Sequence, residues 1–416
     1  MVLKIKGNRI WLTAIAILFA VTLTTTVIHI FKNGSSKDDI LSTTVANGAQ
    51  KTTSDTSDIF RVNIKGMRGV WIPFMSLDTN QHSESSFKNN FDSLAETAVK
   101  NKINTLIVHV RPFSDALYNS DIFPCSHILS GTQGETAEYD ALKYMIEKTH
   151  EKGMKFHAWV NPYRIKTSDT PSKLSDDGIL SRLSDDDIIE YDGGIYINPS
   201  SEKGRSIIIE GVKEIVKNYD VDGVQFDDYF YPSSDNSLDI SSYREYMSGL
   251  DSEAVALSHS EWRKAQVNML ISSVYSAVKQ MKPKVVFGVS PQGNISNCSD
   301  IGADVGLWCQ NEGYADYICP QAYVNFEHSF LPFDKMLSQW KELAGNNKTS
   351  LCVGLALYKA NNGDYDGGSW KNKNDILKQE VEYCRKNGID NFIIYDIDYL
   401  DDDNTMEEVR NVVSIF

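Results

Sequence analysis

The stretch VDGVQFDDYFYP, residues 221–232, decides the fold of this chain. It starts as a short apolar strand and ends in two adjacent carboxylates, Asp227 and Asp228, which aromatic residues follow. Asp is unfavourable inside a β-strand and common where a strand gives way to a turn or a helix cap. The pair therefore marks the end of a strand, and it indicates a functional site only if other strands end in polar residues beside it.

Seven other strand-like segments accompany this one, as short apolar runs typical of strands covered on both faces. The eight strands are predicted at residues 67–74, 103–110, 154–160, 221–226, 284–289, 315–318, 351–357 and 391–395. Helical spacing of apolar residues predicts helices at residues 83–102, 141–152, 205–219, 261–281, 304–310, 333–344, 376–386 and 406–413. Eight strand–helix units predict an α/β fold, a (β/α)8 TIM barrel with long loop insertions. A doubly wound open sheet would require a Gly-rich phosphate loop after the first strand, and the sequence has none there.

The N-terminal residues predict that the barrel is exported. Basic residues precede a run from Ile10 to Phe31 that contains no Asp, Glu, Lys or Arg. A helix needs about 20 apolar residues to cross a bilayer, and a basic flank favours the cytoplasmic side. The expected parts are a cytoplasmic basic end (1–9), a transmembrane anchor (10–31), a flexible polar linker (32–65) and an extracellular barrel domain (66–416). A cleaved signal segment is the alternative, and it would leave a secreted protein.

Charge and composition exclude several classes of partner. The formal net charge is −15 at pH 7, so the chain lacks the basic field that nucleic-acid binding requires. The six cysteines form no CxxC pair, and no HExxH motif occurs, so we expect neither a metal nor another cofactor. Cys319 and Cys352 are interpreted as small buried residues, whereas a Cys298–Cys309 disulfide stays open.

In a TIM barrel, residues just after a strand lie at the catalytic end and residues just before a strand lie at the opposite end. This rule selects Asp227 and Asp228 as candidate catalytic residues and sets aside Glu312 and Asp316. The other selected residues are amides, arginines, tyrosines and an acid, which suit stacking against sugar rings and hydrogen bonding to hydroxyls. These candidate substrate-binding residues are Arg111, Asn161, Tyr163, Arg164, Tyr229, Tyr231, Gln292, Gln321, Tyr323, Tyr358 and Asp396.

Two histidines lie within predicted strands, His109 in the second and His157 in the third. An inward histidine is more often a hydrogen-bonded core residue than a ligand, although the pair would also suit the bottom of a pocket.

Six segments resemble one known family. They are MRGVWIPF (67–74), HVRPFSDALY (109–118), FHAWVNPYR (156–164), VDGVQFDDYFYP (221–232), VSPQG (289–293) and DYICPQAY (316–323). In this order they resemble the barrels of glycosyl-hydrolase-like family ten, which includes the DigH-type peptidoglycan glycosidases. The resemblance covers about residues 66–400 and implies hydrolysis of peptidoglycan glycan strands stripped of their stem peptides. Independently, the D-G-x-x-x-D pattern of residues 222–227 is similar to the nucleophile strand of α-amylase-type barrels.

Two acids on one strand end do not flank a scissile bond, because glycosidase carboxylates stand about 5–5.5 Å apart in retaining enzymes and about 6.5–9.5 Å in inverting ones. The first hypothesis is therefore substrate-assisted catalysis. Asp227 orients the acetamido N–H of the sugar, and Asp228 protonates the leaving oxygen, its pKa raised by an ionised Asp227. Arg111 or Arg164 would hold the lactyl carboxylate of MurNAc.

Two alternatives remain open. A two-carboxylate mechanism on this or another extracellular polysaccharide would pair Asp227 with Glu327, Asp396 or Asp398. A non-catalytic protein that binds wall glycan would use the same groove without turnover.

Overall fold

The computed structural model describes residues 62, 64–345 and 348–416. They belong to a compact unit, Thr56–Phe416, that contains the predicted barrel domain. The predicted basic end (1–9), the anchor (10–31) and nearly all of the linker (32–65) lie outside the described residues. Within the described part, none of the helices combines the length and the apolar character needed to span a bilayer.

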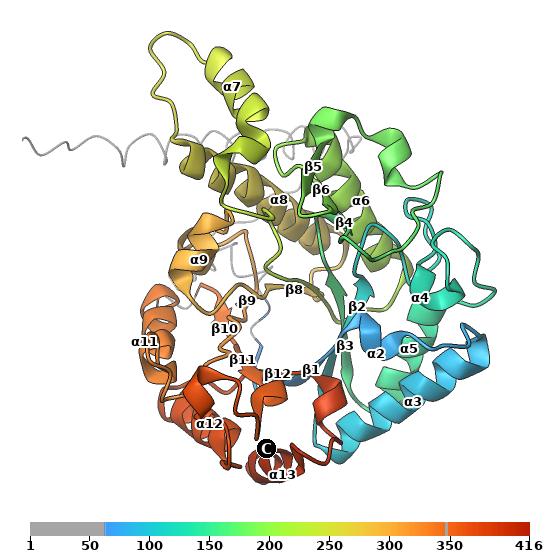
Figure 1. Ribbon diagram of the computed structural model, residues 1–416, viewed down its shortest axis with the longest axis vertical. Coiled ribbons are helices and arrows are strands. Elements are labelled where there is room, and N and C mark those ends of the chain that lie inside the picture. Colours follow the sequence, from blue (N-terminus) through green and yellow to red (C-terminus); the bar gives the residue numbers. More distant parts are fainter. Residues whose placement is uncertain (1–61, 63, 346–347) are drawn as a thin grey trace, which may run out of the picture. The chain divides into compact units, whose positions relative to one another are not determined.

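Among the described residues, nine strands form one parallel sheet in the order β10-β9-β8-β7-β3-β2-β1-β12-β11 (Figure 1). The strands are β1 (Arg68–Ile72), β2 (Thr105–Arg111), β3 (Lys155–Val160), β7 (Gly223–Phe226), β8 (Val286–Val289), β9 (Tyr317–Ile318), β10 (Ser350–Leu351), β11 (Val353–Ala356) and β12 (Phe392–Tyr395). Every predicted strand is present within its expected range or one residue beyond it.

The two ends of this sheet order, β10 and β11, follow each other along the chain with only Cys352 between them. β10 pairs with β9, whereas β11 pairs with β12. The Cys352 amide donates to the Ile318 carbonyl at 2.9 Å, which joins the two sides. The seventh predicted strand is thus split, so the sheet has nine strands instead of eight and curls into a nearly closed barrel.

The described residues contain all eight helices that apolar spacing predicts, with small shifts at their ends. They are α3 (Glu84–Lys100), α5 (Ala141–Glu151), α6 (Glu202–Asn218), α8 (His259–Met281), α10 (Val305–Gln310), α11 (Phe333–Leu343), α12 (Ile376–Lys386) and α13 (Met406–Val413). Figure 1 shows these helices around the strands. Hydroxyl caps fix several starts: Ser83 caps α3, and Ser258 forms a capping box with Glu261 in α8.

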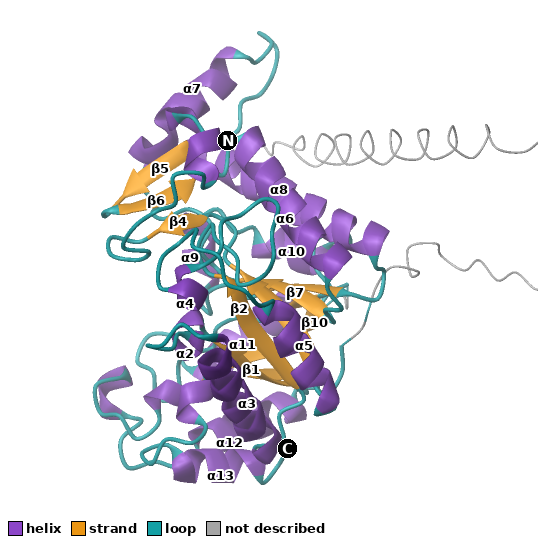
Figure 2. Cartoon of the chain, turned by 90° about the vertical axis from the view of Figure 1, so that its right-hand side faces the viewer, coloured by secondary structure: helices purple, strands orange, loops and turns teal. Residues whose placement is uncertain are grey.

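The insertion after β3 contains a sheet that the sequence did not predict. β4 (Arg164–Lys166), β5 (Ile188–Tyr191) and β6 (Gly194–Ile197) pair antiparallel in the order β4-β6-β5, close to α7 in Figure 2. The turn between β5 and β6 uses Asp192 and Gly193 at φ values of 50° and 73°, as a type I′ hairpin requires. Four short helices were also missed: α2 (Phe74–Leu77), α4 (His127–Ser130), α7 (Ile240–Ser248) and α9 (Ile295–Asp300).

The six cysteines are free thiols, so the Cys298–Cys309 disulfide is not formed. Cys319 and Cys352 are fully buried in the interior of the barrel, in agreement with the sequence interpretation.

A hydrogen-bonded chain runs through the barrel interior. The Trp71 indole N–H donates to the Gln225 side chain at 2.6 Å, and the Gln225 amide donates to the Tyr317 hydroxyl at 3.0 Å. His157 Nδ1 lies 3.1 Å from the same hydroxyl, so His157 is the hydrogen-bonded core residue that we expected. The Tyr317 ring fits because β8 has a glycine, Gly288, opposite it: a Cβ there would stand 2.1 Å from Tyr317 Cζ.

Gly288→Ala should therefore lower the free energy of unfolding by about 1–3 kcal/mol, the usual cost of overpacking a filled interior. Denaturant titration would measure the change. Gly249→Ala is the matched control, because the nearest atom to its Cβ would be 3.6 Å away. Equal stability changes in the two variants would contradict this account of the interior.

Candidate active site

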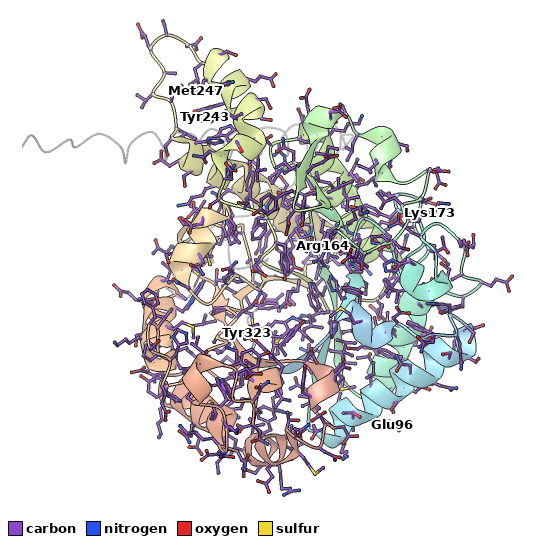
Figure 3. All side chains as sticks on the ribbon, in the orientation of Figure 1. Glu96, Arg164, Lys173, Tyr243, Met247 and Tyr323 are labelled. Carbon is purple, nitrogen blue, oxygen red and sulfur yellow. The ribbon has the colours of Figure 1, made fainter. Side chains whose placement is uncertain are left out.

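A pocket of about 300 Å³ opens at the carboxyl ends of the parallel strands. Its lining residues lie on or just after these strands, and Figure 3 labels two of them, Arg164 and Tyr323, inside the ring of helices. The lining consists of Trp71, Pro73, Phe74, Met75, His109, Trp159, Arg164, Asp227, Asp228, Tyr229, Ser290, Gln321, Tyr323, Tyr358 and Tyr395. The pocket is therefore aromatic, with two adjacent acids and one arginine.

Asp227 follows β7 and is only 3% exposed. Its Oδ2 accepts two hydrogen bonds, from Trp159 Nε1 at 3.0 Å and from Asn161 Nδ2 at 3.1 Å. Its Oδ1 has no partner among the described residues. Burial raises the pKa of Asp227 to about 7; the Arg164 charge opposes this rise, and the Asp228 charge adds to it.

Asp228 is held from the opposite side of the pocket. Its Oδ1 accepts a hydrogen bond from Gln321 Nε2 at 2.8 Å, and the Gln321 and Gln292 side chains both lower the pKa of Asp228. Burial is the largest cause of the raised pKa of Asp228, and not, as we expected, the charge of Asp227. The two acids are therefore fixed by different strands, with separate hydrogen-bond donors.

The floor of the pocket contains a stacked pair, His109 of β2 and Trp159 of β3, with ring centroids 3.8 Å apart and planes tilted by 6°. Burial lowers the pKa of His109 well below its usual value, so the ring is neutral at pH 7. The stack fixes the plane of the Trp159 indole, whose N–H points at Asp227. Of the two histidines considered from sequence, His109 lines this pocket and His157 does not.

Three tyrosines make one wall of the pocket. Tyr323, Tyr358 and Tyr395 contact one another with ring centroids 5.8–6.0 Å apart, in tilted or edge-to-face arrangements. Rings held in this way offer aromatic surface without further loss of side-chain freedom.

Arg164 is the cation of the pocket. Its Nε donates to the Pro112 carbonyl at 3.0 Å. Its guanidinium lies over the rings of Phe113, at 4.9 Å, and Tyr229, at 5.2 Å. Its two Nη atoms make no hydrogen bond to the described residues, so they are free to bind an anion.

Three predicted substrate-binding residues do not line this pocket. Arg111 is buried against α6, where its guanidinium lies 4.5 Å from the Phe123 ring centroid. Tyr163 packs edge-on against Phe230, and Tyr231 packs against a buried arginine of α8. All three point into the layer between the sheet and the helices, because the side chains of a strand and of its extension alternate between two faces.

Three other predicted residues are also absent from the pocket lining, and two of them act on the acids from behind it. Asn161 donates a hydrogen bond to Asp227, and Gln292 lowers the pKa of Asp228, but neither residue lines the pocket. Asp396 accepts a hydrogen bond from the Asp398 amide, and burial raises the pKa of Asp396 to about 7. It is not among the lining residues, whereas Arg164, Tyr229, Gln321, Tyr323 and Tyr358 are.

The remaining acids considered from sequence are engaged elsewhere. Glu327 pairs with Lys373, and the Asp398 carboxylate accepts a hydrogen bond from the Ser76 hydroxyl at 2.8 Å. Asp316, set aside by its position before a strand, forms an ion pair with Lys279 at 2.6 Å.

Sequence reasoning missed Trp71, Trp159 and Tyr395 as pocket residues. Apart from the two histidines, it considered only side chains that follow a strand and did not consider inward-facing side chains in the last residues of the strand itself. The signal was available, because Trp159 precedes Asn161 by two residues and therefore faces the same way.

An aromatic pocket with paired acids at the carboxyl end of a parallel barrel is an arrangement typical of the glycoside hydrolase class. Residues 66–372 match the family described as "Glycosyl hydrolase-like 10". Glycosyl hydrolase DigH of Escherichia coli (strain K12) is 32% identical over 386 residues, which cover 84% of this chain and 87% of DigH. The chain belongs to the glycosyl hydrolase-like 10 family.

A second relative and two solved structures complete the comparison. Glycosyl hydrolase YngK of Bacillus subtilis (strain 168) is 34% identical over 338 residues, and the match covers 75% of this chain but 64% of YngK. The glycoside hydrolase domain of PgaB (BpsB) from Bordetella bronchiseptica has a TM-score of 0.56 at 14% identity, covering 84% of this chain and 99% of that domain. The β-amylase catalytic domain of Paenibacillus polymyxa gives 0.57 at 10% identity, with 85% and 99% covered. At these identities the two structures share the fold alone.

The raised pKa of Asp227 predicts a stabilising substitution. A carboxyl whose pKa rises on folding contributes stability that is complete below its unfolded pKa, near 4, and is lost as pH rises through about 7. Asp227→Asn removes this loss, so it should raise the free energy of unfolding at pH 8 by up to about 4 kcal/mol and change it little at pH 4.

Thermal or denaturant unfolding at both pH values would measure this. The control is Asp316→Asn, which leaves Lys279 without its buried partner and should destabilise the protein by about 3–5 kcal/mol. If the free energy of unfolding of Asp227→Asn at pH 8 is lower than that of the wild type, the prediction is contradicted.

Proposed function

We propose that the protein is an extracytoplasmic glycoside hydrolase acting on N-acetylated cell-wall glycan, the MurNAc/GlcNAc strands of peptidoglycan. The observation that carries this proposal is the pair Asp227 and Asp228, buried side by side in an aromatic pocket at the carboxyl ends of the strands. Membership of a glycosyl hydrolase-like family supports the reaction class, and the resemblance to DigH-type glycosidases supports the substrate. The apolar run 10–31 supports a single-pass membrane anchor with the barrel outside, or secretion if the run is cleaved.

The pocket favours substrate assistance over a second carboxylate. Among its described lining residues, Asp227 and Asp228 are the only acids. The partners that a two-carboxylate mechanism would need, Glu327, Asp396 and Asp398, are not in this lining. An acetamido group on the sugar supplies the missing nucleophile.

In this mechanism Asp227 receives the acetamido N–H of the substrate at its Oδ1. Its Oδ2 is already occupied by Trp159 and Asn161, so the orientation of the free oxygen is fixed. Asp227, whose pKa is about 7, accepts the N–H in its ionised form and pulls electron density toward the acetamido carbonyl oxygen. That oxygen attacks the anomeric carbon, and the bond to the leaving oxygen breaks.

Asp228 supplies the proton that the leaving oxygen takes with the bonding electron pair. Burial raises the pKa of Asp228 above its usual value, the direction that a general acid requires. A water molecule then attacks the anomeric carbon of the cyclic intermediate, and Asp228 takes the proton from that water. The bond between the anomeric carbon and the acetamido oxygen breaks, and its electron pair restores the acetamido carbonyl. The product keeps its original anomeric configuration because two inversions have occurred.

A thiazoline analogue of the N-acetyl sugar resembles the cyclic intermediate and should inhibit competitively. The measurement is release of soluble fragments from peptide-free glycan strands by the full-length protein, with and without the analogue. The matched control is the same sugar with a 2-hydroxyl in place of the fused ring, which should not inhibit. Turnover that the thiazoline leaves unchanged would favour a two-carboxylate mechanism.

Asp228→Asn should lower kcat by about 10²–10⁴-fold, the usual contribution of a general acid, while glycan binding is retained. Tyr243→Phe in α7, outside the pocket lining, serves as a control that should turn over normally. If wild-type protein binds glycan strands but releases no product, the protein is a wall-binding module and the hydrolase proposal fails.

A further inference from the structure

We infer that Arg164 places MurNAc, and not GlcNAc, in the subsite beside Asp227, so that cleavage leaves MurNAc at each new reducing end. This inference rests on the proposed function and adds to it which of the two alternating bonds is cut. It follows from where the one cation of the pocket lies relative to the two acids.

Arg164 is a preformed site for a carboxylate. Its guanidinium is held between the rings of Phe113 and Tyr229, and its Nε is bound to the Pro112 carbonyl. Arg164 lines the pocket, and its Nη atoms make no hydrogen bond to described residues. A planar fork of this kind binds a carboxylate with two parallel hydrogen bonds, and little side-chain freedom is lost on binding.

Arg164 lies on the Asp227 side of the pocket. Its backbone amide donates to Asn161 Oδ1 at 2.9 Å, and Asn161 Nδ2 donates to Asp227 at 3.1 Å, so one side chain joins the two residues. Asp228 is held from elsewhere, by Gln321 after β9. The charge of Arg164 lowers the pKa of Asp227 more than any other group does, which agrees with this geometry.

The chemistry of the sugar turns this geometry into a choice of subsite. In MurNAc the acetamido group is on C2 and the lactyl ether is on O3, so both substituents project from neighbouring carbons of one ring. If Asp227 receives the acetamido N–H, the lactyl carboxylate of the same ring meets Arg164. GlcNAc in that position would offer only a hydroxyl to the charged fork.

The leaving-group side has no counterpart. Arg164 is the only Lys or Arg among the described lining residues, and His109 is neutral. Around Asp228 the lining offers Gln321, Ser290 and Tyr323, which suit hydroxyl and amide groups. GlcNAc therefore occupies the site beyond Asp228, and its O4 is the leaving oxygen. The lactyl carboxylate is free only when the stem peptide is absent, so the same contact favours stripped strands.

The test uses the full-length protein with peptide-free glycan strands, followed by borohydride reduction and acid hydrolysis of the products. Muramicitol, the alcohol of a reducing-end MurNAc, is the expected product of reduction. Glucosaminitol would overturn the inference while leaving the proposed function intact. If no soluble fragments form at all, the proposed function fails first.

Arg164 itself is tested by substitution. Arg164→Gln should lower kcat/KM on peptide-free strands roughly 10- to 100-fold, the loss expected for a charge-assisted hydrogen-bonded pair. On strands whose lactyl carboxylates have been reduced to alcohols, Arg164→Gln should lose much less activity, because only the effect of Arg164 on the pKa of Asp227 is then removed. Arg164→Lys keeps the charge but not the planar guanidinium, so its kcat/KM on peptide-free strands should lie between those of the wild type and Arg164→Gln. It also provides a second variant in case Arg164→Gln does not fold.

The control is Lys166→Gln, which removes a charge from the same strand outside the pocket lining and should cleave like wild type. An Arg164→Gln variant that folds, and that loses equal activity on native and carboxyl-reduced strands, would show that Arg164 does not read the carboxylate.

Discussion

The burial of the Asp227 carboxyl group is the constraint on which the site depends. A carboxyl group removed from water is costly unless donors reach it, and here Trp159 of β3 and Asn161 just after β3 both donate to one oxygen. The parallel register aligns Trp159 with Gln225 and Val160 with Phe226, so the next residues, Asn161 and Asp227, stand side by side. A slip of one residue between β3 and β7 would turn one donor away and leave the carboxyl group buried without support.

The same constraint explains why the barrel interior is unusually polar and aromatic. TIM barrels usually fill their interior with branched aliphatic residues, which pack well but make no hydrogen bonds that would orient neighbouring polar side chains. Here a chain of hydrogen bonds from Trp71 through Gln225 to Tyr317, and the stack of His109 on Trp159, occupy that space. Each of these aromatic rings is fixed by a partner, so the floor under the acids is rigid. A rigid floor keeps the donors of Asp227 in place without reorganisation during a reaction.

The sequence predicts most of the fold because the apolar periods of its strands and helices are strong and their order is regular. It does not predict the split of the seventh strand at Cys352, because that split depends on pairing with two different neighbours when the barrel closes. For the site, the position of a residue after a strand predicts at which end of the barrel it lies. It does not predict whether its side chain points into the pocket or toward the surrounding helices. Arg111 and Tyr163 therefore pass the sequence rule and still point toward the helices, while Trp159, one residue inside its strand end, was passed over.

Arg164 is positioned by an insertion, whereas the two acids are positioned by the barrel. It opens β4, which pairs with β6 of the small sheet and not with the barrel, so the insertion after β3 sets its place. The acids, in contrast, follow a strand whose position is fixed by both neighbours. The two acids are thus positioned by the barrel, whereas the position of the Arg164 charge depends on the insertion. Under the proposed function, altering the β4–β6–β5 sheet should change which glycan fits. Asp227 would keep its place after β7, and of its two donors only Asn161, which accepts a hydrogen bond from the Arg164 amide, is linked to the insertion.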